Sequence, residues 1–164
     1  MTVSDGQGGS AGGSVIVVVN APLPGALGLT ALRLGLNFAA PNKDTCKAAG
    51  AFLLSASFQP LGAAVELDVG GAVQDFTLDA RGKGISAQGK IRVKWKRRTG
   101  NWTFKTSWKG GNWANDWADD GLVNADTLGT AVQVPATLQV GSSIWAGVKT
   151  LTYKAKLGRS GKAR

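Results

Sequence analysis

Histidine is absent from the chain, and cysteine occurs only once, at Cys46. Without an imidazole, the sequence has no Ser–His–Asp or Cys–His catalytic arrangement and no histidine-based zinc site. A single cysteine also rules out an intramolecular disulfide and a four-cysteine metal centre. We therefore expect no enzymatic activity, no cofactor and no metal site. Cys46 itself is expected to be a small apolar residue of the core.

Long apolar segments are missing as well. The longest run, residues 15–19 (VIVVV), is far shorter than the ~20 residues of a membrane-spanning helix. The polar, glycine-rich residues 1–14 have no basic region of the kind that opens a signal peptide. We expect no membrane span, and we expect any export signal to lie outside this chain.

The composition favours strands. The chain contains 24 glycines among 164 residues and 43% hydrophobic residues, and it lacks long stretches of good helix formers. Apolar and polar residues alternate with period two, as in strands with one buried face, over residues 32–38, 52–58, 65–69, 73–78, 90–96, 102–109, 131–140 and 143–156.

These patterns predict an all-β fold, specifically an antiparallel immunoglobulin-like β-sandwich over residues 27–157. Residues 61–65 (LGAAV) match residues 128–132 (LGTAV) at an offset of 67, which indicates an internal duplication. One short helix is expected near residues 112–120, because Asn112 and Gly121 fit its two ends.

The first residues carry a resemblance. A glycine-rich turn over residues 2–10 (TVSDGQGGS) precedes an apolar segment over residues 14–22 (SVIVVVNAP) that ends in a proline. This order resembles the last hairpin of the cadherin-like and immunoglobulin-like repeats of bacterial surface proteins. The resemblance covers residues 2–22 only. The module that follows resembles uncharacterised modules of secreted bacterial proteins.

The resemblance implies an extracellular or cell-surface location and a structural or adhesive role within a larger protein, whose other domains or subunits would be the partners. The expected division is an orphan hairpin over residues 1–22, a linker over 23–26, the β-sandwich module over 27–157, and a basic flexible tail over 158–164.

Positive charge is concentrated in the second half of the chain. The net charge is +9, yet residues 1–79 have a net charge of −3 and residues 80–164 a net charge of +12. In the hairpin expected over residues 90–109, cations alternate with apolar residues and so share one face: Lys90, Arg92, Lys94, Lys96, Arg97, Arg98, Lys105 and Lys109. This face is either a solvated exterior or a surface that binds a polyanion such as nucleic acid, an anionic glycan or a lipid headgroup.

Five of the six tryptophans fall between positions 95 and 117. Trp95, Trp102 and Trp108 follow the apolar face of the hairpin, so we expect them in the core. Trp113 and Trp117, four residues apart on the expected helix, and Trp145, in an expected strand, are candidate ligand-binding residues. Their exposed indoles would make the chain a carbohydrate-binding module. Three hypotheses therefore stand: a structural or adhesive module, a carbohydrate-binding module and a polyanion-binding module.

Overall fold

The computed structural model describes residues 2–4, 10–12 and 24–164. Thr2–Ser4 (β1) and Ser10–Gly12 (β2) pair as a short antiparallel hairpin. The rest of the expected N-terminal hairpin, including its strand over residues 14–20, lies outside the described residues.

All the other described strands belong to one sheet of eleven strands. In chain order they are β3 (Gly25–Ala26), β4 (Gly28–Asn37), β5 (Asp44–Phe52), β6 (Ala64–Val69), β7 (Ala72–Thr77), β8 (Lys83–Ile85), β9 (Gly89–Lys96), β10 (Asn101–Gly111), β11 (Thr127–Val140), β12 (Ser143–Lys156) and β13 (Ser160–Ala163). The order across the sheet is β7-β6-β11-β12-β13-β4-β5-β10-β9-β8, with every neighbouring pair antiparallel, and β3 lies parallel to β12.

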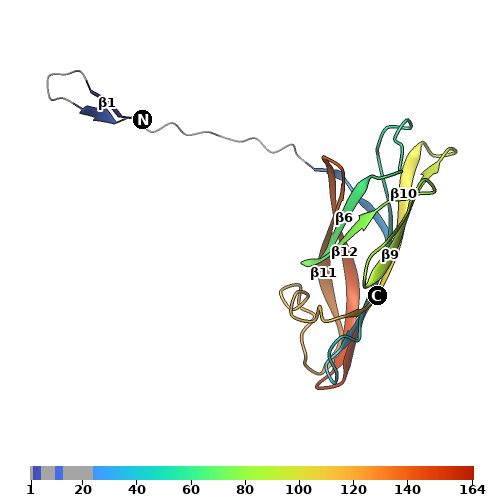
Figure 1. Ribbon diagram of the computed structural model, residues 1–164. Helices are drawn as coiled ribbons and strands as arrows, with labels where there is room; N and C mark the ends of the chain where they lie inside the picture. Colours follow the sequence, from blue (N-terminus) through green and yellow to red (C-terminus); the bar gives the residue numbers. More distant parts are fainter. Residues whose placement is uncertain (1, 5–9, 13–23) are drawn as a thin grey trace.

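The sheet curls until its two end strands, β7 and β8, contact each other, so that it nearly closes into a barrel (Figure 1). Side chains bridge the junction: Ser86 Oγ donates to Gln74 Oε1 at 2.8 Å, and Gln74 Nε2 donates to Gln88 Oε1 at 3.2 Å. The all-β prediction is confirmed. Instead of a sandwich of two sheets, the structure shows a single sheet, because β13 pairs with both β12 and β4 and because β6 pairs with β11.

Internal pseudo-symmetry relates the two halves of the barrel. Strands β4 to β8 correspond in order to β9 to β13, and each strand has the corresponding neighbours around the barrel. The one difference is that β12 and β13 are joined by backbone hydrogen bonds, whereas the corresponding strands β7 and β8 are not. Gly70 N–H donates to Pro135 O at 2.9 Å, and Gly141 N–H donates reciprocally to Ala64 O at 3.1 Å. Gly70 therefore corresponds to Gly141, whereas the sequence offset of 67 would have matched it to Thr137.

Strand β5 differs from the sequence prediction because its inward residues are small. The alternation over residues 52–58 predicted a strand there, but β5 ends at Phe52. Its buried positions include Cys46, Ala48 and Gly50, none of which gives a strong apolar signal. Cys46 lies opposite Trp108 of β10, and Gly50 lies opposite Phe104. A Cβ on Gly50 would lie 2.6 Å from Phe104 Cε1, so the ring occupies the space that the glycine leaves.

The expected helix over residues 112–120 is absent. Trp117 N–H bonds to Trp113 O across four residues, but Ala118, Asp120 and Gly121 N–H bond across three, so the segment forms consecutive turns. Its two asparagines and three aspartates are weak helix formers.

The buried carboxylate of Asp44, rather than the side chain of Asn112, fixes the start of this segment. Asp44 is only 2% exposed. Its Oδ2 accepts the N–H groups of Trp113 at 2.7 Å and Ala114 at 2.9 Å, and its Oδ1 accepts that of Asn37 at 2.8 Å. One side chain at the start of β5 therefore ties together the end of β4 and the loop between β10 and β11.

The chain end and the expected linker also belong to the sheet. Residues 158–164, predicted as a flexible tail, contain β13, and Ala163 is buried in the core. Within residues 23–26, Gly25 and Ala26 form β3 beside β12. The basic, glycine-rich composition of the tail concealed a strand because only alternate residues, Gly161 and Ala163, face inward.

Removal of residues 160–164 should destabilise the barrel strongly, because β13 is bonded on both sides. We expect the free energy of unfolding to fall by about 3 kcal/mol or more, since each ladder bond contributes about 1 kcal/mol. Chemical denaturation measures this change. The control, Lys162→Thr with Arg164→Thr, removes the charges but keeps the strand and should not lower stability. Equal stability of the truncated and full chains would show that β13 is dispensable.

Asp44→Ala should also be strongly destabilising, because it leaves three N–H groups without their acceptor. Each unsatisfied buried donor costs about 1–3 kcal/mol, so we expect a loss of about 3 kcal/mol or more, with a red shift of tryptophan emission as the loop around Trp113 loosens. Asp75→Ala, at an exposed position of β7, is the control and should change stability by less than about 0.5 kcal/mol. A loss for Asp44→Ala no larger than that of the control would contradict this role.

Candidate polyanion-binding surface

The three tryptophans considered as ligand-binding residues are buried, which corrects the expectation of exposed indoles. Trp113 and Trp145 are 6% exposed and Trp117 is 0% exposed. Trp113 packs between Trp108 and Trp117, with ring centroids 5.6 Å apart in both pairs. Trp117 Nε1 donates to Val69 O at 2.8 Å. Because these indoles fill the barrel, they offer no free face to a sugar ring.

The tryptophans of the β9–β10 hairpin also point inward. Trp102 and Trp108 are buried, as predicted. Trp95, near the end of the hairpin, is half-buried and packs against Trp102 with ring centroids 5.7 Å apart. Trp102 and Trp108 are therefore core residues, whereas Trp95 lies at the margin of the core, in a hollow beside Lys96 and Arg97.

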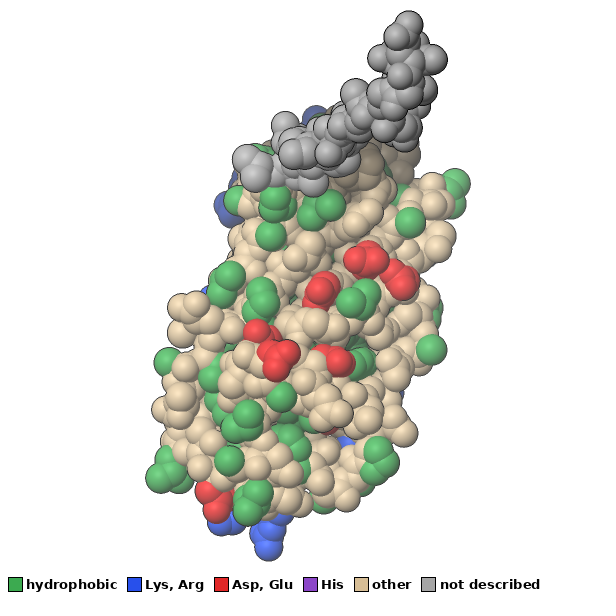
Figure 2. Space-filling view, turned by 90° about the vertical axis from the view of Figure 1, so that its left-hand side faces the viewer, with side chains coloured by type: hydrophobic (Ala, Val, Ile, Leu, Met, Phe, Trp, Pro, Cys, Tyr) green, Lys and Arg blue, Asp and Glu red, His purple; other side chains and the backbone are tan. Residues whose placement is uncertain are grey.

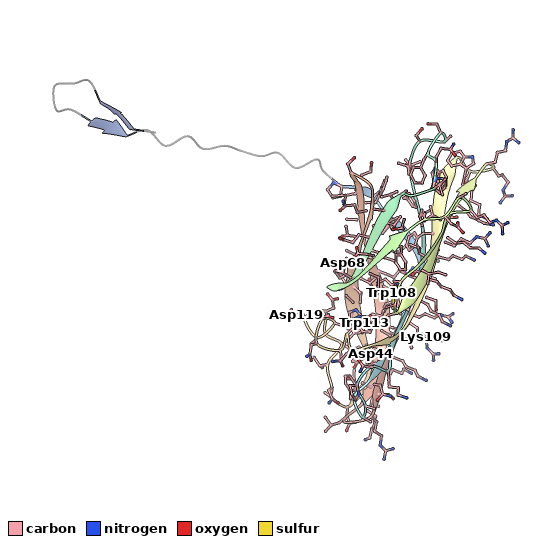
Figure 3. All side chains as sticks on the ribbon, in the orientation of Figure 1. Asp44, Asp68, Trp108, Lys109, Trp113 and Asp119 are labelled. Carbon is pink, nitrogen blue, oxygen red and sulfur yellow. The ribbon has the colours of Figure 1, made fainter. Side chains whose placement is uncertain are left out.

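All eight cations predicted for the polyanion surface are exposed on the outer face of β9 and β10 or on the turn between them. In Figure 3, basic side chains with blue tips project along this side of the molecule, where Lys109 is labelled. The predicted face thus exists as one surface.

Strand pairing extends this surface well beyond the hairpin. Following directly paired residues across the sheet gives three rows of outward-facing, exposed cations, which together we call the cationic band. Row 1 contains Lys83, Arg92 and Lys105 on β8, β9 and β10. Row 2 contains Lys90, Lys47 and Arg33 on β9, β5 and β4, with Ser107 of β10 between the first two. Row 3 contains Lys109, Lys162 and Lys154 on β10, β13 and β12, with Thr45 and Gly35 between the first two.

Several cations in the band lie directly opposite one another. The register pairs Lys83 with Arg92 and Arg92 with Lys105 in row 1, Lys47 with Arg33 in row 2, and Lys162 with Lys154 in row 3. Like charges at directly opposed positions destabilise a sheet. The seven strands that carry the band contain one carboxylate, and it is the buried Asp44.

The positive charge of the band is not neutralised by ion pairs among the described residues. In the ranges that the structure describes, the one ion pair joins Lys156 to Asp126 at 3.2 Å, and neither residue belongs to the three rows. Hydrogen bonds from Leu157 N–H and Lys156, together with the charge of Lys156, hold the pKa of Asp126 below its usual value. The band therefore has no internal counter-charge.

A hollow of about 450 Å³ lies over β8, β9 and β10. Row 1 lines it together with Lys90, Ser107 and Ile85, and Ile85 is 82% exposed. The densest group of cations thus surrounds a depression in the surface.

Acidic residues gather on another side of the barrel. Glu66 of β6 lies opposite Asp75 of β7, and Asp68 and Asp119 lie on the side away from Lys109 (Figure 3). Figure 2 shows this acidic face, where red side chains cluster and few blue ones are visible. Within the described ranges no group of three or more His, Cys, Asp or Glu residues is placed to hold a metal ion.

Sequence reasoning found the hairpin cations but missed Arg33, Lys47, Lys83 and Lys154, and it assigned Lys162 to a flexible tail. Apart from Lys83, which lies on the neighbouring β8, these cations come from strands remote in sequence, and only the register of the sheet brings them into the same rows. No run of alternating cations like that of β9 marks them, because β4, β5, β8 and β13 each contain a single cation.

The remaining candidate for chemistry is the thiol of Cys46. It is fully buried, and burial raises its pKa, so it stays protonated and unreactive. The part of the chain that the structure describes contains no helix long and apolar enough to cross a membrane. Comparisons with protein-family models, with curated proteins and with solved structures find no match.

Because Cys46 faces the core, it should resist a thiol reagent such as Ellman's reagent until the protein unfolds. A matched variant, Cys46→Ala with Thr45→Cys, moves the thiol one residue along β5 to its exposed face and should react in the native state. The rate of reaction at neutral pH, with and without denaturant, checks both statements. Rapid labelling of native Cys46 would mean that the face of β5 carrying Cys46 points to solvent and not to the core.

Proposed function

We propose that this chain is a non-catalytic β module of a larger secreted or cell-surface bacterial protein, and that it binds a polyanion through the cationic band. The proposal rests on the cations of the band, several of which lie directly opposite one another with no exposed carboxylate on the same strands. An external polyanion supplies the counter-charge that the sheet lacks.

The surface location rests on the resemblance of residues 2–22 to the last hairpin of bacterial surface repeats. A non-catalytic role is supported by the lack of histidine and by the burial of the single thiol. A carbohydrate site built on Trp113, Trp117 and Trp145 is not favoured, because these three residues are in the core. The three rows of cations are the remaining feature with a specific chemistry.

Neutralising two adjacent cations of row 1 should weaken polyanion binding and stabilise the free protein. For Arg92→Gln with Lys105→Gln, we expect earlier elution from a heparin column and a salt slope of log K smaller by about 2, since two ionic contacts are lost. The free energy of unfolding should rise by up to about 1 kcal/mol, since repulsion between opposed strands is relieved.

The control removes the same charge elsewhere. Lys43→Gln with Arg159→Gln alters exposed cations in the β4–β5 and β12–β13 turns, outside the three rows. This variant should bind heparin almost as the unmodified chain does. If both double variants lost heparin affinity equally, binding would depend on the net charge of the chain and not on the position of the cations in the band.

A further inference from the structure

We infer that the polyanion is an acidic polysaccharide whose chain runs across the strands, around the barrel. This inference rests on the proposed function and adds the class of ligand and its direction. It is based on three features of the band: the direction in which its cations continue, the spacing between them and the kind of side chain that lies among them.

The direction follows from where the cations continue. Along β9, outward-facing cations recur at every second residue from Lys90 to Lys96 and end with the hairpin turn. Across the strands, the rows continue from β8 through β9, β10, β5, β4 and β13 to β12. Arg33, Lys47, Lys154 and Lys162 are reached only by crossing strands. A linear ligand that uses the whole band must therefore lie across them.

The spacing of the charges fits a polymer of sugar acids. Adjacent strands are about 4.8 Å apart, whereas alternate residues along one strand are about 6.6 Å apart. A 1,4-linked polyuronate has one carboxylate per sugar, and its repeat is close to the distance between strands. The phosphates of an extended single-stranded nucleic acid are farther apart and are closer to the spacing along one strand. Row 1 places a cation on each of three adjacent strands, so its long side chains can follow the sugar repeat of a polyuronate, whose successive carboxylates point to different sides of the chain.

The side chains among the cations point to the same class of ligand. Ser107, Thr45, Ala49 and Gly35 lie between or beside the cations of the rows. Within the three rows no aromatic side chain faces outward, because the buried tryptophans, phenylalanines and tyrosine of these strands occupy inward positions. The half-buried Trp95 lies outside the rows, in a hollow beside Lys96 and Arg97. Proteins that bind single-stranded nucleic acids stack the bases on exposed aromatic rings. Small and hydroxyl-bearing residues instead leave a flat surface that can accommodate sugar rings.

The test compares two pairs of cations near Arg92. Lys83 and Lys105 lie on either side of it across the sheet, whereas Lys94 and Lys96 follow it along β9, outside the three rows. The variants Lys83→Gln with Lys105→Gln and Lys94→Gln with Lys96→Gln remove the same charge at exposed positions. The ligands are polygalacturonate oligomers of defined length, with an oligothymidylate of equal charge as the comparison, and the measurement is isothermal titration at fixed ionic strength.

We expect the unmodified chain to bind the polygalacturonate oligomer more tightly than the oligothymidylate. The variant that lacks the pair across the strands should bind the polysaccharide about tenfold more weakly than the unmodified chain. The variant that lacks the pair along β9 should bind it less than about threefold more weakly. Tighter binding of the oligothymidylate, or an equal or greater loss for the pair along β9, would overturn this inference and favour a nucleic acid lying along the strand. If neither pair affects the binding of any polyanion, the proposed function itself fails.

Discussion

When a single sheet curls on itself, one of its faces is buried inside the barrel and the other is exposed to solvent. This constraint determines which side chains form the core and which form the surface. Each strand sends alternate side chains inward, so an indole and a neighbouring lysine of the same strand must lie on opposite sides of the sheet. Trp102 and Trp108 are therefore core residues, while Lys105 and Lys109 on the same strand are exposed. Closure of the sheet separates the aromatic interior from the cationic exterior.

The same closure brings like charges together. If β12 and β4 belonged to separate sheets, Lys154 and Arg33 would not be part of one surface. Strand β13 pairs with both strands and so joins their cations. The resulting repulsion is offset by the packed core and by the buried carboxylate of Asp44, which satisfies three N–H groups. A fold that retains opposed cations against this repulsion is easiest to explain if an acidic ligand neutralises them.

The sequence predicted those parts of the molecule that depend on local alternation. Large apolar residues mark β4, β6, β9 and β10, and the cationic face of the β9–β10 hairpin follows from the same pattern. It did not predict β5, whose inward residues are small; at Gly50 the ring of Phe104 from β10 fills the space. Nor did it predict β13, or the turns after Trp113 that are held by a carboxylate 69 positions earlier in the chain. The rows of the cationic band depend on strand register, which no local pattern encodes.

If the polyanion contacts the outer face of β8, β9, β10, β5 and β4 as one surface, a bound oligomer should perturb amides on all five strands. A titration of the ¹⁵N-labelled protein with a short polygalacturonate oligomer, followed by NMR, measures this. We expect chemical-shift changes for the amides around Arg92, Lys105, Lys47 and Arg33, and little change around Glu66 and Asp75. Changes confined to the hairpin turn at Arg97 and Arg98, or centred on β6 and β7, would show that the polyanion does not bind to this surface.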